Sequence, residues 1–79
     1  MNDDIYIAGD IERALASDPR THELGIRAEA RPGVIVLHGE VATAERRLLV
    51  TQVAAEVAHG MIVRNEVTIT AVLPPEFGS

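Results

Sequence analysis

Three stretches of the chain place apolar residues at alternate positions, the pattern of strands with one buried face. They cover residues 26–31, 34–41 and 63–70. Pro32 and Gly33 separate the first two stretches and predict a tight turn, so these two strands are expected to form a hairpin.

Two other stretches repeat their apolar residues at helical spacing. The first covers about residues 4–16 and ends before the pair Asp18-Pro19, because a residue that precedes proline is pushed away from helical geometry. The second covers about residues 44–58, between an N-cap at Thr43 and a C-cap at Gly60. The sequence therefore predicts two helices.

The predicted order is αββαβ, which gives an α+β fold with a three-stranded mixed sheet and two helices packed on one face. A strand, helix, strand connection joins parallel neighbours, so the second and third strands should be parallel and the first two antiparallel. The predicted core includes Ile35, Leu37, Val41, Val53, Val57, Val67 and Ile69. The other face is expected to be polar and open, with Arg27, Glu29, Arg31, Val36, His38, Glu40, Arg64, Glu66, Thr68 and Thr70.

Length and composition indicate one small folded domain. The chain has 79 residues, of which 47% are hydrophobic and 24% charged, an ordinary globular balance. Residues 1–73 are interpreted as this domain, and residues 74–79 as a flexible tail left by cloning. With one Phe, one Tyr and no Trp, stacking of bases or sugars on aromatic side chains is not expected.

The net charge of −5 argues against nucleic-acid binding and predicts weak or no binding to anionic membranes. No stretch of about 18 apolar residues is present, and the acidic N-terminus is unlike a secretory signal. Read as a complete chain, the protein is expected in the cytoplasm.

No residues are spaced for catalysis or metal binding. His22, His38 and His59 lack ligand spacing, the chain has no cysteine, and no histidine and carboxylate are placed by sequence to activate Ser17. We therefore predict neither an enzyme nor a bound metal or cofactor.

The pattern of the chain resembles the BON domain, the bacterial OsmY and nodulation domain. The resemblance covers about residues 7–70, with one residue fewer than usual between Gly60 and Val63. Its most specific part is the second-strand pattern from Gly33 to Val41. The matching residues are Ala14-Leu15, Asp18-Pro19, Gly33-Val34-Ile35-Val36-Leu37-His38-Gly39-Glu40-Val41, Gly60, Val63 and Asn65.

The resemblance implies a non-catalytic module that binds phospholipid or another hydrophobic or amphipathic partner. Such modules are common in bacterial envelope and stress-response proteins, often beside other domains, so a chain excised from a longer protein would be envelope-associated. The alternative function is protein interaction or self-assembly through an exposed strand edge or the open sheet face.

Arginines are the candidate ligand-binding residues. Arg46 and Arg47 lie in the first turn of the second predicted helix, where they could bind an anion or form a solvated pair balanced by Glu45. Arg27, Arg31 and Arg64 could form a basic stripe on the open face. Glutamates are interleaved with that stripe, which favours cross-strand ion pairs.

Three glycines are predicted to be structural. Gly33 belongs to the hairpin turn and Gly60 to the helix cap. Gly39 is expected to make room for a helix over the sheet, with close approach of a ligand as the alternative.

Overall fold

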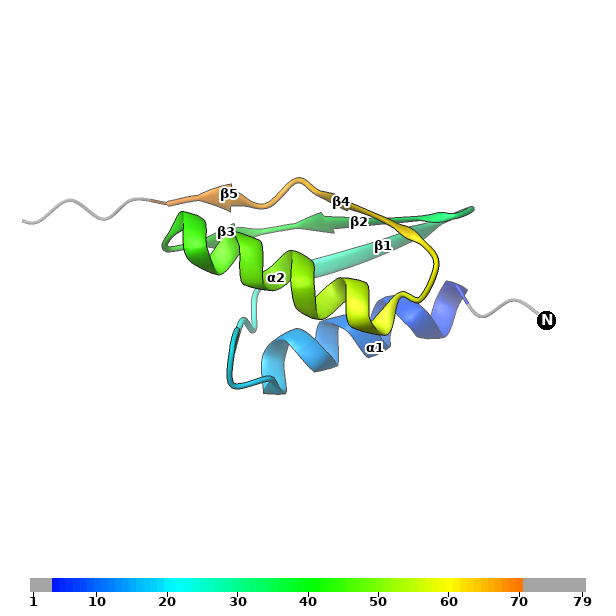
Figure 1. The fold of residues 1–79 in the computed structure, drawn as a ribbon, viewed down its shortest axis with the longest axis horizontal. Helices are drawn as coiled ribbons and strands as arrows, with labels where there is room; N and C mark the ends of the chain where they lie inside the picture. Colours follow the sequence, from blue (N-terminus) through cyan, green and yellow to red (C-terminus); the bar gives the residue numbers. More distant parts are fainter. Residues whose placement is uncertain (1–3, 71–79) are drawn as a thin grey trace, which may run out of the picture.

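The computed structural model describes residues 4–70, and the side chains of residues 6–70. The described residues follow the predicted order of helix, hairpin, helix and strand (Figure 1). The predicted tail, residues 74–79, lies outside the described residues. The elements are α1 (Asp4–Ser17), β1 (Arg27–Arg31), β2 (Val34–His38), β3 (Glu40–Val41), α2 (Ala44–Val57), β4 (Ile62–Asn65) and β5 (Thr68–Ile69).

The main sheet has the strand order β1-β2-β4. The central strand, β2, pairs antiparallel with β1 and parallel with β4, so both predicted strand directions are confirmed. A second, parallel pair, β3 and β5, continues β2 and β4 beyond the main sheet.

Two of the predicted strands are interrupted rather than continuous. Gly39 separates β2 from β3, and Glu66 and Val67 separate β4 from β5. The hydrogen bonds still cross both interruptions, because Glu66 N–H donates to Leu37 at 2.9 Å and Thr68 N–H to Gly39 at 2.9 Å. The chain segment of β2 and β3 therefore stays paired with that of β4 and β5 through both interruptions.

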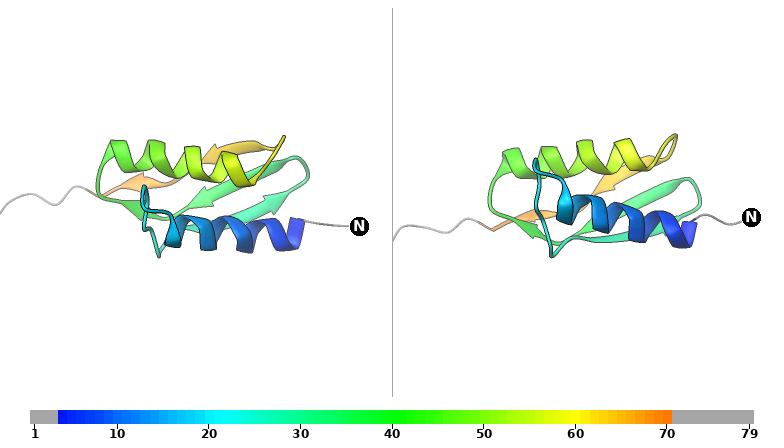
Figure 2. Two further views of the ribbon diagram at one scale, coloured as in Figure 1. Left: turned by 60° about the horizontal axis from the view of Figure 1, so that its bottom comes forward. Right: turned by 90° about the horizontal axis from the view of Figure 1, so that it is seen from below.

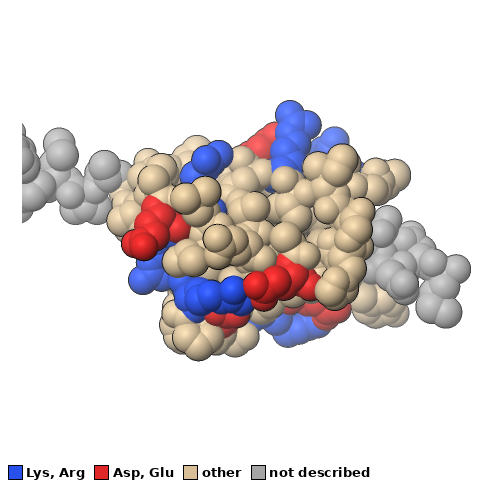
Figure 3. Space-filling model, viewed as in Figure 1, with Lys and Arg blue, Asp and Glu red and all other residues tan. Residues whose placement is uncertain are grey.

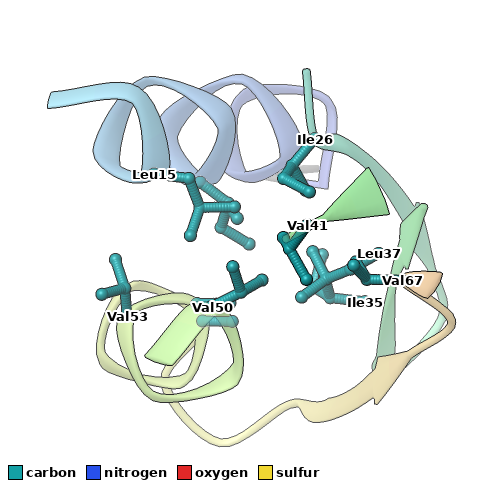
Figure 4. Packing of buried hydrophobic residues seen from close by; sticks show 11 residues of the cluster. Leu15, Ile26, Ile35, Leu37, Val41, Val50, Val53 and Val67 are labelled. Atoms are coloured by element: carbon teal, nitrogen blue, oxygen red, sulfur yellow. The ribbon is translucent and has the colours of Figure 1, made fainter. Parts of the chain in front are cut away.

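Both helices lie on the same side of the sheet, as predicted (Figure 2). The core fills the space between them and the sheet, where Leu15 of α1 and Val50 of α2 approach the β2 side chains (Figure 4). Because the side chains of successive strand residues alternate, β2 sends Ile35 and Leu37 into this layer. The buried cluster is Ile11, Leu15, Ile26, Ile35, Leu37, Val41, Val50, Val53, Ala54, Ala58 and Val67.

Six of the seven predicted core residues lie in or against this cluster, with Val57 half-buried at its border. The prediction is wrong for Ile69, which is 45% exposed. Ile69 belongs to the two-residue strand β5, whose one described neighbour is β3, so less of the fold covers it than covers the main sheet.

Gly39 is required by the backbone, although its neighbour differs from the predicted one. Its φ is +142°, and a Cβ there would lie 2.9 Å from the carbonyl oxygen of Gly25 and 3.3 Å from Cα of Ile26. The predicted helix contact is wrong, because the close neighbour is the segment that leads into β1. Gly33 (φ +74°) occupies the predicted hairpin turn. The predicted cap at Gly60 is wrong by two residues, because Ala58 caps α2 and Gly60 (φ +77°) lies in the turn that follows.

Within residues 4–70, no helix has the length and apolar character needed to cross a membrane.

Candidate binding surface

The sheet face opposite the helices, called the open face below, carries most of the candidate binding residues. It is formed by side chains of β1, β2 and β4 that point away from the core. In the register of the sheet they form three rows across the strands. The rows are Arg27 and His38; Glu29, Val36 and Arg64; and Arg31, Val34 and Ile62.

Charged groups on the open face are paired along each strand. Arg31 contacts Glu29 at 3.1 Å, and Arg64 contacts Glu66 at 3.0 Å. His38 lies between the two carboxylates, 3.5 Å from Glu29 and 3.7 Å from Glu66. The arginines therefore do not make the predicted cross-strand ion pairs, because β2 places valines between β1 and β4.

One end of the open face is amphipathic. Ile62 is 67% exposed and lies beside half-buried Val34, next to the hairpin turn. Arg31 flanks Val34 on one side, and Arg64 lies two residues along β4 from Ile62. We call these four residues the amphipathic corner. Val36, in the next row, is only 5% exposed and lies between the longer side chains of Glu29 and Arg64 in its row.

Arg46 and Arg47 do not come together at the start of α2. Arg46 donates to the carbonyl of Thr21 and lies 3.6 Å from the Glu23 carboxylate, on the side of α2 that faces the loop after α1. Arg47 donates from Nε to the carbonyl of Val67 at 2.7 Å. Both guanidinium groups bind to backbone carbonyls of the domain, so the expected solvated pair of arginines is wrong.

Asn65, on β4, forms reciprocal hydrogen bonds with Arg47 on α2. Arg47 Nη2 donates to the carbonyl of Asn65 at 2.9 Å, and the Asn65 amide donates to the Arg47 carbonyl at 2.9 Å and to Thr51 Oγ1 at 2.6 Å. Asn65 Oδ1 also accepts from the N–H of Val67 at 2.9 Å. The signal in the sequence was a polar residue at an inward position, between Val63 and Val67.

Sequence reasoning missed an ion-pair cluster that ties the loop after α1 to the end of α2. The Arg20 guanidinium makes two hydrogen bonds of 2.8 Å to the Glu56 carboxylate and two, of 2.8 and 3.0 Å, to the Asp18 carboxylate. Hydrogen bonds from Arg20 lower the pKa of Asp18 to about 2 and also lower the pKa of Glu56. Asp18 and Glu56 lie 38 positions apart in the sequence (56 − 18), so no local pattern reveals the cluster.

This cluster predicts a pH dependence of stability. Because the folded-state pKa values of Asp18 and Glu56 are depressed, the stabilisation should be complete above the unfolded-state values near 4 and should be lost as the pH falls toward about 2. Arg20→Gln should therefore be less stable than wild type at neutral pH, and the difference should narrow in acid. Denaturation curves across this pH range would measure it, and a constant difference would contradict the assignment.

The described residues offer no candidate metal site. Within residues 4–70, no three His, Asp or Glu side chains gather so that they could hold a metal ion. The buried polar residue Thr21 is satisfied, because its hydroxyl donates to the carbonyl of Leu15 at 2.7 Å.

Basic and acidic side chains are also mixed on the side of the molecule that shows α2 with β4 and β5 above it (Figure 1). In Figure 3, which has the same view, blue and red groups lie beside one another around an uncharged centre, and no broad surface of one sign is seen. Binding by charge alone is therefore not favoured on that side.

A comparison with protein families agrees with the fold and the motif. The sequence model of the BON domain matches residues 3–71, nearly the whole chain, so this chain belongs to the BON domain family. Membership of this family indicates a binding module in general terms. A search of curated proteins gives no match.

Proposed function

We propose that this BON domain binds an anionic amphipathic partner, namely phospholipid, at the amphipathic corner of the open face. The observation that carries the proposal is the exposure of Ile62 (67%), which lies two residues from Arg64 on β4 and in one row with Val34 and Arg31. No backbone carbonyl engages either arginine in the described residues. An acyl chain would cover Ile62 and Val34. The headgroup phosphate would replace Glu29 or Glu66 as the partner of Arg31 or Arg64.

The start of α2 supports lipid binding less well than the sequence suggested. Arg46 and Arg47 would each have to give up a hydrogen bond to a backbone carbonyl before binding a phosphate. Arg31 and Arg64 would only exchange an exposed carboxylate for a phosphate, and exposed ion pairs contribute at most about 1 kcal/mol. The open face is therefore the better site.

The affinity of this corner for an anionic bilayer should be low. Each arginine near such a surface contributes about 1 kcal/mol, and covering the exposed part of Ile62 adds about 1 to 2 kcal/mol. The sum of about 3 to 4 kcal/mol corresponds to roughly millimolar binding. We therefore expect cosedimentation with anionic liposomes at low salt, little at physiological salt, and none with neutral liposomes.

A matched pair of variants tests the site. Arg64→Glu should abolish cosedimentation at low salt, whereas Arg13→Glu, an equal change of charge on α1 at an arginine that is 74% exposed, should reduce it only slightly. Submicromolar binding at physiological salt that is lost in an Arg46→Glu, Arg47→Glu double variant would overturn the proposal and move the site to α2.

A protein partner is the second candidate, and the charge balance of the open face favours it. Arg27, Arg31 and Arg64 are interleaved there with Glu29 and Glu66, although the whole chain carries a net charge of −5. Interleaved charges suit a partner with a matching pattern better than a uniformly anionic surface. Sizing chromatography beside the liposome assay separates the two functions, because self-assembly on this face would raise the apparent mass without lipid.

A further inference from the structure

The outer edge of the third strand line, β4 and β5, is partly covered by side chains. Along this line the even-numbered residues point their backbone groups inward, toward β2 and β3. The inward bonds run from Ile62 to Gly33, Glu66 to Leu37, Thr68 to Gly39 and Thr70 to Val41, at 2.8 to 2.9 Å. Because neighbouring residues of a strand point to opposite sides, the odd-numbered residues from 63 to 69 direct their N–H and carbonyl groups to the outer edge.

Two side chains occupy the middle of this edge. Arg47 donates to the outward carbonyls of Asn65 (2.9 Å) and Val67 (2.7 Å). The side chain of Asn65 accepts the outward N–H of Val67 at 2.9 Å. We call Arg47 and Asn65 the edge clasp. A strand that added to this edge would need these same backbone groups.

The covered segment has the composition of a strand that pairs readily with copies of itself. Six of the nine residues from 62 to 70 are β-branched, none is proline, and Arg64 and Glu66 cancel each other in charge. Short segments of high β-propensity and low net charge are prone to pair edge to edge when exposed. Without a cover, this segment would present a free pairing edge.

At the opposite edge of the sheet, a side chain also binds an outward backbone group. The carboxylate of Glu12, on α1, accepts the N–H of Ala28 at 2.8 Å. Ala28 lies on the edge strand β1, so this N–H is occupied by a side chain of the domain itself. Side chains from each helix thus cover backbone groups at one edge of the sheet.

We propose that the edge clasp covers a latent self-association surface, whose partner is the same segment of a second copy of this chain. The clasp keeps the domain monomeric by occupying the backbone groups that the second copy would bind. This inference stands independently of lipid binding, because the clasp lies on an edge and the amphipathic corner lies on the open face.

Arg47→Met tests the inference, because methionine fills similar space without donating hydrogen bonds. The variant should remain folded by circular dichroism and become dimeric or larger as its concentration rises from micromolar toward millimolar in light-scattering chromatography. Arg46→Met is the matched control. It removes an equal charge from the adjacent residue, whose bonds go to Thr21 and Glu23 away from this edge, and it should stay monomeric.

A second substitution shows whether the association uses this edge. Ile69→Pro removes an outward N–H while Thr70 keeps its inward bond to Val41, so Arg47→Met with Ile69→Pro should return to a monomer. If Arg47→Met does not fold, Arg47→Lys decides, because lysine cannot bond both carbonyls with a planar fork and should associate partially. The inference would be overturned if Arg47→Met folds and stays monomeric toward millimolar concentration. If Arg47→Met does not fold, the same result for a folded Arg47→Lys would overturn it. Association that persists with Ile69→Pro would also overturn it.

Discussion

Replacing Gly39 with valine is expected to lower the free energy of unfolding by about 2 to 4 kcal/mol. Two costs combine at this position. A β-branched residue is strained at a φ of +142°, and its Cβ would lie 2.9 Å from the Gly25 carbonyl oxygen, where backbone has to move. Denaturant unfolding curves of the two proteins would measure the loss.

Gly60→Asn is the matched control for this substitution. Gly60 also has a positive φ, +77°, but no heavy atom would lie within 4 Å of an added Cβ, and asparagine tolerates this backbone region. Its effect should stay below about 1 kcal/mol. An unchanged unfolding midpoint for Gly39→Val would mean that the Gly25 segment is free to move away, and the close packing of that segment against Gly39 would have to be abandoned.

Asn65→Leu is expected to destabilise the domain by about 2 to 4 kcal/mol, although leucine has the same number of side-chain heavy atoms in the same branched arrangement. The side-chain amide makes hydrogen bonds to the Arg47 carbonyl, to Thr51 and to the N–H of Val67. Losing them leaves backbone groups without these partners in a half-buried region, at about 1 kcal/mol or more for each bond. Thermal and denaturant unfolding would both report the change.

Thr51→Val provides a graded comparison. It removes one acceptor of the Asn65 amide and keeps the other two bonds, so it should cost about 1 kcal/mol. Equal effects of Asn65→Leu and Thr51→Val would contradict the view that Asn65 connects α2 to β4 through several bonds.

The elements of this fold could be predicted because their signals are local. Alternation of apolar residues identified the strands, and Thr43 marked the start of α2, where its hydroxyl accepts the Arg46 N–H at 3.0 Å. The interruptions near Gly39 and Val67 were missed, because the alternation of apolar and polar residues is the same before and after each break in the strand. Ile69 was misplaced because periodicity gives the face of a residue and not how far the helices cover it.

The site was less predictable because it depends on where side chains reach. Arg46 and Arg47 are adjacent in sequence, but successive residues of a helix point about 100° apart, so one faces the loop after α1 and the other faces the strands. The interleaved charges of the open face were expected, whereas the amphipathic corner requires the register that sets Val34 opposite Ile62.

The covering of the sheet edges also could not be predicted from local sequence. A free strand edge was a reasonable expectation from three strands, because the sequence alone does not show that Arg47 and Glu12 reach backbone groups on β-strands. These contacts join residues 16 to 20 positions apart, beyond the reach of any local pattern. They weaken strand addition as a function and favour the proposed site on the open face.

Backbone amide chemical-shift mapping by NMR, with anionic and then neutral lipid vesicles at low salt, tests the proposed binding surface most directly. The account predicts shifts or broadening that centre on Arg31, Val34, Ile62 and Arg64 with anionic lipid, and none with neutral lipid. Perturbations confined to the first turn of α2 around Arg46 and Arg47, or absent at every residue, would contradict it.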